Sequence, residues 1–143
     1  MGKSNTFSND LLKLIYNAVA IANLADNAGS LPLTNLYVAL HTADPGAAGN
    51  QTTSEISYTG YARVAVLRTS SGWTVTGTSV SPTLDVDFPT STGGTGGTAT
   101  YASVGTASSG TGKILHSGAL SPNIVITTGV PPVIVQGSTI TEA

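Results

Sequence analysis

Histidine, serine and aspartate are the residues of this chain whose types could perform nucleophilic or acid–base chemistry. His41 and His116 are its two histidines, and His41 is followed closely by Asp44. A Ser–His–Asp set could be imagined there, but any Ser-rich chain offers such combinations, and the chain has no Gly-x-Ser-x-Gly motif. The sequence therefore predicts no catalytic residues and no enzyme activity. It places both histidines at the surface or at a strand edge.

Two carboxylates, Asp85 and Asp87, have the spacing of neighbours on one face of a strand. Such a pair could bind Ca²⁺ or act as an acid–base pair. A Ca²⁺ site needs more oxygen ligands, and no third carboxylate lies near them in the sequence. We therefore expect no metal site, and we expect both carboxylates on the solvent face of a strand whose other face carries Leu84, Val86 and Phe88.

The glycine-rich run at residues 93–98 superficially resembles a phosphate-binding loop. A Walker loop ends in Lys followed by Ser or Thr, and a dinucleotide-binding loop joins a strand to a helix. Neither context is present, so we predict a flexible loop and no cofactor. The chain also has no cysteine, which excludes disulfides, thiol catalysis and Cys-ligated zinc.

The low content of charged residues is the most informative property of the composition. Only 8% of the 143 residues are charged, and the formal net charge is −2, whereas about 25% is usual. Interface cores are depleted of charge, so this favours a surface that a partner covers. The alternative is a neutral, Thr-rich β-domain. The sequence shows no basic patch of the kind that indicates nucleic-acid binding, so no nucleic-acid partner is expected. Neither a signal peptide nor an apolar run long enough to span a membrane is expected.

Residues 8–28 are predicted to form one helix. Ser8 and Asn9 are favourable N-cap residues, and Asp10 suits the positive end of a helix. Pro32 prevents continuation. The helix would cover the sheet of its own domain or, alternatively, dock on a neighbouring subunit. Its apolar stripe, at helical spacing, would consist of Leu11, Leu14, Ile15, Ala18, Val19 and Ala22.

After Pro32 the pattern changes to alternation with a period of two, which is typical of strands. Trp73 and Tyr101 are predicted core aromatics. The polar stretch 42–59 contains turn chemistry at Asp44-Pro45-Gly46 and is predicted to be an extended arm or a binding loop. The predicted strands lie near residues 36–40, 63–68, 73–78, 84–88, 101–105, 113–120, 124–126 and 133–135.

Several short strands separated by turn signals indicate a mainly β fold, either a jelly-roll-like sandwich or an open barrel, with one N-terminal α-helix. The composition is uniform after the helix, so the sequence predicts a single domain over residues 1–143. This domain would contain the helix at 8–28 and a β-rich part at 33–143.

An ordered set of motifs spans nearly the whole chain and resembles small virion proteins of tailed bacteriophages, often called tail fibre proteins. The motifs, in one-letter code, are LYVALHTADPG at 36–46, GNQ at 49–51, EISY at 55–58, GYARV at 60–64, VDFP at 86–89, GTASSG at 105–110, KILHSG at 113–118 and ITE at 140–142. The resemblance implies a structural role in a virion.

Within that role, the leading hypothesis is a capsid decoration, or cement, protein on the capsid surface. Its partners would be the major capsid protein and other copies of itself, as a dimer or a trimer. A tail component (fibre, tip or tube-associated subunit) is the alternative, and a carbohydrate-binding module is a less favoured one. Residue types common in turns and interface hot spots give the predicted partner-contact cluster, which consists of Asp44, Pro45, Gly46, Tyr58, Tyr61 and Arg63.

Overall fold

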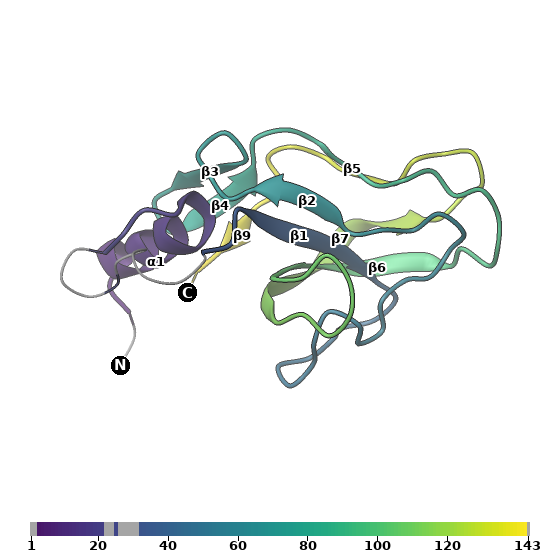
Figure 1. The fold of residues 1–143 in the computed structure, drawn as a ribbon, viewed down its shortest axis with the longest axis horizontal. Helices are drawn as coiled ribbons and strands as arrows, with labels where there is room; N and C mark the ends of the chain where they lie inside the picture. The colour runs from purple at the N-terminus through teal and green to yellow at the C-terminus, as the bar shows by residue number, and fades with distance from the viewer. Residues whose placement is uncertain (1–2, 22–24, 26–31, 143) are drawn as a thin grey trace. The chain divides into compact units, whose positions relative to one another are not determined.

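A computed structural model describes residues 3–21, 25 and 32–142 of the chain (Figure 1). It contains one helix, α1 (Asn5–Asn17), and three antiparallel sheets. The predicted mainly β fold with one N-terminal helix is therefore confirmed. The strands are β1 (Asn35–His41), β2 (Val64–Leu67), β3 (Trp73–Thr76), β4 (Ser79–Pro82), β5 (Val86–Asp87), β6 (Thr98–Gly105), β7 (Ile114–Val125), β8 (Val133–Ile134) and β9 (Ile140–Thr141).

The chain divides into two compact units, each built from separated segments. Unit 1 comprises residues 1–35, 66–85 and 135–143, and unit 2 comprises residues 36–65 and 86–134. The single domain expected from the uniform composition stays a prediction.

Unit 1 is formed by α1 and the sheet with the strand order β3-β4-β9. Ser4 caps the helix, because its side-chain oxygen accepts a hydrogen bond from the Phe7 backbone N–H at 3.2 Å. Tyr16 packs edge-on against Trp73 with ring centroids 4.7 Å apart, and both rings are buried. The Asn17 side chain donates to the Trp73 carbonyl at 3.0 Å. These contacts hold the helix against β3.

The predicted helix bounds, 8–28, are wrong at both ends. The helix begins at Asn5 because Ser4, rather than Ser8, supplies the cap. It ends at Asn17 because Ala18 adopts a left-handed conformation, with φ 55°. Residue 25 and residues 18–21 are not helical, and 22–24 and 26–31 lie outside the described residues.

The buried face of the helix also differs from the predicted stripe. It consists of Ser8, Leu12 and Tyr16, which follow one another at intervals of four residues. Leu11, Leu14 and Ile15 are only half-buried, and Val19 is exposed. The buried face lies one position away from the predicted stripe, because Tyr16 packs against Trp73 and turns its own face of the helix towards the sheet. Ala22 lies outside the described residues.

Unit 2 contains most of the sheet with the strand order β2-β1-β6-β7 and the short pair β5-β8. β1 and β6 are antiparallel, with Val38 opposite Val104 and His41 opposite Tyr101. Tyr101 is half-buried, so the prediction of a core aromatic holds fully only for Trp73. The core of unit 2 is lined by Leu36, Val38, Leu40, Ile56, Tyr58, Val86, Phe88, Ala99, Val104 and Ile126.

β7 is longer than predicted. The segments 113–120 and 124–126, which Ser121-Pro122-Asn123 separates in the sequence, form one continuous strand from Ile114 to Val125. Its partner β6 begins at Thr98, inside the predicted glycine-rich loop. The 12-residue β7 is an edge strand of its sheet, and it pairs with β6 from Thr98↔Val125 to Gly105↔Ile114. The register shifts between Ala99 and Tyr101 of β6, opposite residues 120–123, and again between Val104 and Gly105.

Candidate partner-contact site

The segment between β1 and β2 carries all six predicted contact residues. It does not extend away as an arm but folds back along the end of β1. The Thr42 N–H donates to the Ser54 carbonyl at 2.8 Å, and the Ile56 N–H donates to the Leu40 carbonyl at 2.9 Å. These bonds close residues 42–55 into a loop that is anchored at both ends.

A tight turn at Asp44-Pro45-Gly46 forms the first part of this loop. The Gly46 N–H donates to Asp44 Oδ1 at 2.8 Å, which is an Asx turn. Gly46 has φ 71°, a conformation that glycine adopts at no steric cost. Pro45 is buried, whereas Asp44 and Gly46 are exposed. Of this turn, only the latter two are placed to meet a partner.

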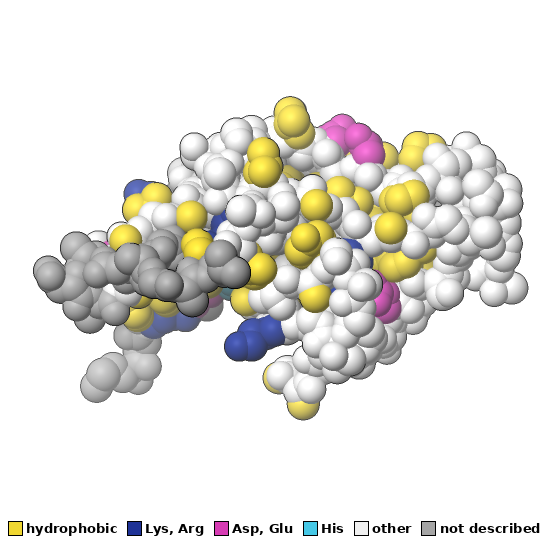
Figure 2. Space-filling model, in the orientation of Figure 1, with side chains coloured by type: hydrophobic (Ala, Val, Ile, Leu, Met, Phe, Trp, Pro, Cys, Tyr) yellow, Lys and Arg dark blue, Asp and Glu magenta, His cyan; other side chains and the backbone are white. Residues whose placement is uncertain are grey.

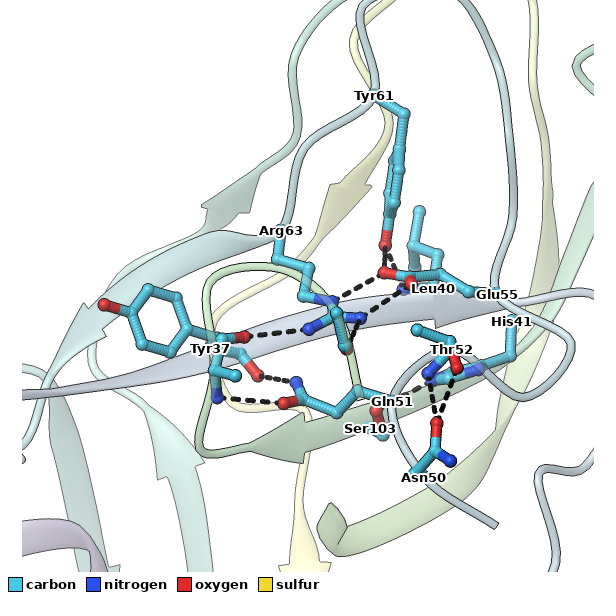
Figure 3. Close-up of polar contacts among 12 residues, drawn as sticks. Tyr37, Leu40, His41, Asn50, Gln51, Thr52, Glu55, Tyr61, Arg63 and Ser103 are labelled. Atoms are coloured by element: carbon cyan, nitrogen blue, oxygen red, sulfur yellow. Dashed lines mark hydrogen bonds and ion pairs between the residues drawn. The ribbon is translucent and has the colours of Figure 1, made fainter. Parts of the chain in front are cut away.

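Arg63 and Glu55 form the principal ion pair of the loop (Figure 3). Arg63 Nε and Nη2 donate to the two carboxylate oxygens of Glu55, both at 2.7 Å. The same guanidinium donates to the carbonyls of Ala107 at 3.0 Å and Gly110 at 2.8 Å. The hydrogen bonds with Glu55 raise the pKa of Arg63. The residue is 9% exposed, so it joins three segments of its own chain rather than presenting a free cation.

Tyr61 shares the Glu55 carboxylate with Arg63. Its hydroxyl donates to Glu55 Oε1 at 3.0 Å and accepts from the Leu40 N–H at 3.1 Å. Burial is the main cause that raises the pKa of Tyr61. Tyr58 packs edge-on against Tyr61, with centroids 5.3 Å apart, and its hydroxyl donates to the Pro89 carbonyl at 2.7 Å. Tyr61 also stacks on Phe88 at 6.3 Å, so both tyrosines belong to the core edge.

Gln51 fills the space beneath the loop and is completely buried. Its amide nitrogen donates to the Tyr37 carbonyl at 3.3 Å, and its amide oxygen accepts from the Ala107 N–H at 3.0 Å (Figure 3). A Cβ atom at Gly105 or Gly112 would collide with this side chain. Glycine at these two positions therefore makes room for Gln51, which joins the loop to the turn after β6.

His41 is completely buried at the end of β1, so its predicted surface position is wrong. One ring nitrogen, Nδ1, lies 2.8 Å from the Thr53 carbonyl oxygen, and the other, Nε2, lies 2.7 Å from Ser103 Oγ. A neutral ring that donates from Nδ1 and accepts from the Ser103 hydroxyl satisfies both contacts. Burial is the main cause that lowers the pKa of His41. Ser103 is buried as well, so a substrate has no access to this Ser–His pair.

Three of the six predicted contact residues thus come together, and three do not. Tyr58, Tyr61 and Arg63 form one cluster with Glu55, whereas the side chain of Asp44 binds within its own turn at residues 44–46. Sequence reasoning missed Gln51, Glu55 and the burial of His41. Glu55 carried a signal: it is the acidic residue nearest in sequence to Arg63 within a chain of few charges. Gln51 lies in a polar stretch of the sequence, and nothing in that stretch signals that its side chain is buried.

The other chemical candidates make structural contacts. Asp85 Oδ1 accepts the Gln136 N–H at 2.7 Å, and Asp87 is exposed on β5. Leu84 is 71% exposed, so it does not share the buried face of Val86 and Phe88.

Within the described ranges no three potential metal ligands come together. In the glycine-rich run, the Gly93 carbonyl accepts from the Thr59 N–H at 3.1 Å. Trp73 is too buried to stack on a sugar.

No helix among the described residues has the length and apolar character needed to cross a membrane. A family model described as "Podophage GP4 fiber I protein gp80" matches residues 2–141 of the chain. The search of curated proteins gave no match.

Proposed function

The chain belongs to the family of the podophage GP4 fiber I protein gp80, and on this premise we propose that it is a subunit of a bacteriophage tail fibre. Membership makes it a structural protein of a phage virion. The finer proposal, a place in the tail, rests on the name of the family. The match over residues 2–141 is the observation that carries it, because it covers both compact units.

The arrangement of the 42–63 segment supports a structural role. Its buried polar side chains bind groups of the same chain, which fixes one conformation of the surface above them. A surface held in one conformation loses little conformational entropy when a partner binds. Charged side chains are sparse on the face shown in Figure 2, as they are in interface cores. A non-catalytic role in contact with other virion subunits, including further copies of this chain, fits these features.

Capsid decoration, with the major capsid protein as partner, is the second possibility. The scarcity of charge agrees with it equally well, since the core of any protein–protein interface contains few charged residues. The name of the family favours the tail.

Locating the chain in the virion tests the proposal. A cryo-EM reconstruction of the phage, with the two units fitted separately, is expected to show the chain in appendages of the tail. Density on the capsid lattice would overturn the tail proposal and support decoration. Deleting the gene offers an independent readout: we expect reduced adsorption to host cells with a capsid of unchanged thermal stability, whereas a destabilised capsid would again support decoration.

A further inference from the structure

The buried ring of His41 attaches the 42–55 loop to the sheet of unit 2. It lies between the Thr53 carbonyl of the loop, 2.8 Å from Nδ1, and the Ser103 hydroxyl of β6, 2.7 Å from Nε2. The residues on either side of Thr53 are exposed, so the outer side of the loop faces solvent at this point. Since the ring itself is completely buried, it meets water only when the structure around it opens.

The two hydrogen bonds of the ring suit its neutral form and conflict with its charged form. A neutral imidazole donates from one nitrogen and accepts at the other, whereas an imidazolium donates from both. The Thr53 carbonyl can only accept, so Nδ1 of the neutral ring donates to it and Nε2 accepts from Ser103. A protonated Nε2 would direct a second donor at the Ser103 hydroxyl, whose own proton must then turn elsewhere within a buried site. A buried donor without an acceptor is costly.

The charged neighbours of the ring do not compensate for its burial. The titratable groups on the elements around it are Glu55 of the loop, Tyr61 and Arg63 of the segment after the loop, and Tyr101 of β6. Glu55 favours the charged ring and Arg63 opposes it, and these two form an ion pair with each other, so their effects on the ring counteract. Burial raises the pKa of Tyr61, which keeps this side chain neutral in acid.

We propose that His41 is a pH-sensitive switch of the 42–55 loop: its neutral ring holds the loop closed, and its protonation releases the loop while the strands of unit 2 stay paired. An open loop leaves the ring in water, where its pKa is near 6.5, whereas burial lowers the pKa of the ring under the closed loop. The closed form is therefore fully favoured above pH 6.5. Below pH 6.5 it loses up to about tenfold in its equilibrium constant per pH unit, until the lowered pKa is reached.

Release of the loop would change the surface that it offers to a partner, because Asp44 and Gly46 are exposed on it. Amide hydrogen exchange of the full chain, followed by NMR at pH 7 and pH 5 and corrected for intrinsic rates, tests the switch. The informative amides are those of Thr42 and Ile56, whose hydrogen bonds close the base of the loop. Their protection should fall about ten- to a hundredfold at pH 5, below that of the amides in the β1–β6 ladder. Equal protection of loop and ladder amides at both pH values would overturn the inference, since the loop would then open only with the whole unit.

Two histidine variants separate this ring from other groups that respond to acid. In H41Q the side chain stays uncharged, so the protection of the loop amides should be the same at pH 7 and pH 5. The matched control is H116Q, which removes the half-buried histidine of β7 and should keep the full response. An H41Q chain that still responds would assign the response to another group, such as Glu55, and overturn the inference. An H116Q chain that no longer responds would do the same.

The unchanged chain provides a measurement that does not depend on how well H41Q folds. An NMR titration of the His41 ring should give the same midpoint as the loss of loop protection, and two separate midpoints would overturn the inference. Circular dichroism should show that the sheets persist at pH 5. The switch is a property of the isolated chain, so it stands or falls independently of the proposed place in the tail.

Discussion

Unit 1 and unit 2 differ in what fills their interiors. In unit 1 the helix meets the sheet through Leu12, Tyr16 and Trp73, and among the described residues of this unit Ser8 is the one buried residue of polar type, beside the buried indole N–H of Trp73. The interior of unit 2 holds five further buried polar or charged residues besides its apolar core, namely His41, Gln51, Arg63, Ser91 and Ser103. Apolar contacts stabilise whichever packing excludes water, whereas buried polar groups must find particular partners. The difference suggests that unit 2 is the part whose loop conformation is specified most strictly.

The largest effect is expected from R63A in unit 2. Removing the guanidinium leaves the Glu55 carboxylate without its cationic partner and takes one donor from each of the carbonyls of Ala107 and Gly110. Breaking a buried pair in this way should lower the free energy of unfolding by about 3–5 kcal/mol, measured by urea denaturation. Lys113 is an exposed cation of the same unit, so K113A should change stability by less than about 0.5 kcal/mol. Equal effects of the two substitutions would contradict the assigned role.

In unit 1 the corresponding test removes an apolar side chain. L12A removes a completely buried side chain of the helix and should cost about 2–5 kcal/mol, through lost burial and the cavity left behind. The matched control is F7A, whose side chain lies on the same helix but is 39% exposed and should cost much less. Hydrogen exchange by mass spectrometry should locate the loss of protection in unit 1. Protection lost first in unit 2 would contradict the contrast between the units.

Two glycines of unit 2 distinguish a position where an added methyl group would clash from one where it would fit. G105A would force its methyl group into Gln51 and should cost about 1–3 kcal/mol. At Gly118 a Cβ meets nothing, so G118A should be nearly neutral in stability. The double variant G105A/Q51A should be more stable than the sum of its single effects predicts, since the clash is then absent. Strict additivity in thermal unfolding would argue against contact.

The buried His41 makes unit 2 sensitive to acid. Because its folded-state pKa is lowered from 6.5, the unfolded chain takes up a proton that the folded chain excludes. Stability is therefore complete above pH 6.5 and falls as the pH drops towards the folded-state pKa. One such group gives a slope of at most about 1.4 kcal/mol per pH unit. H41Q should be less stable at neutral pH but should flatten this dependence, with His116 present in both chains. An unchanged slope would exclude His41 as its source.

The smallest effect is expected at the helix cap in unit 1. S4A removes the acceptor of the Phe7 N–H and should cost about 1 kcal/mol. S4D, which keeps an acceptor and adds charge near the positive helix end, should restore stability. Far-ultraviolet circular dichroism during thermal unfolding measures both variants. Equal stability of S4A and the unchanged chain would show that the cap contributes nothing.

The sequence predicted the class of the fold because its signals are local. Alternation with a period of two located most strands, and turn residues marked their ends. The helix bounds failed because Ser4 and Ser8 are both acceptable caps, and contact between Tyr16 and Trp73, 57 positions apart, decided which face is buried. The break expected at Ser121-Pro122-Asn123 is a register shift within β7 rather than the end of a strand, because β6 pairs with β7 on both sides of it.

The candidate site was harder to predict, because residue type does not reveal direction. Tyr58, Tyr61 and Arg63 are of types common at interfaces, yet their polar atoms bind groups of their own chain. The same types serve buried networks and partner contacts, and only the fold distinguishes them. Gln51 lies within a stretch of polar residues, and its burial depends on two glycines more than 50 positions away.

Arg68 has a consequence for how the helix can be isolated. Its guanidinium donates to the carbonyls of Leu14 and Ile15 in the last turn of α1, which have no partners further along the helix. A residue more than 50 positions downstream thus completes the helix. With only 13 residues, α1 is also near the length at which helices are marginal in water. A synthetic peptide covering residues 3–19 should therefore be mostly disordered, and the helical signal of the intact chain should report on the assembly of unit 1.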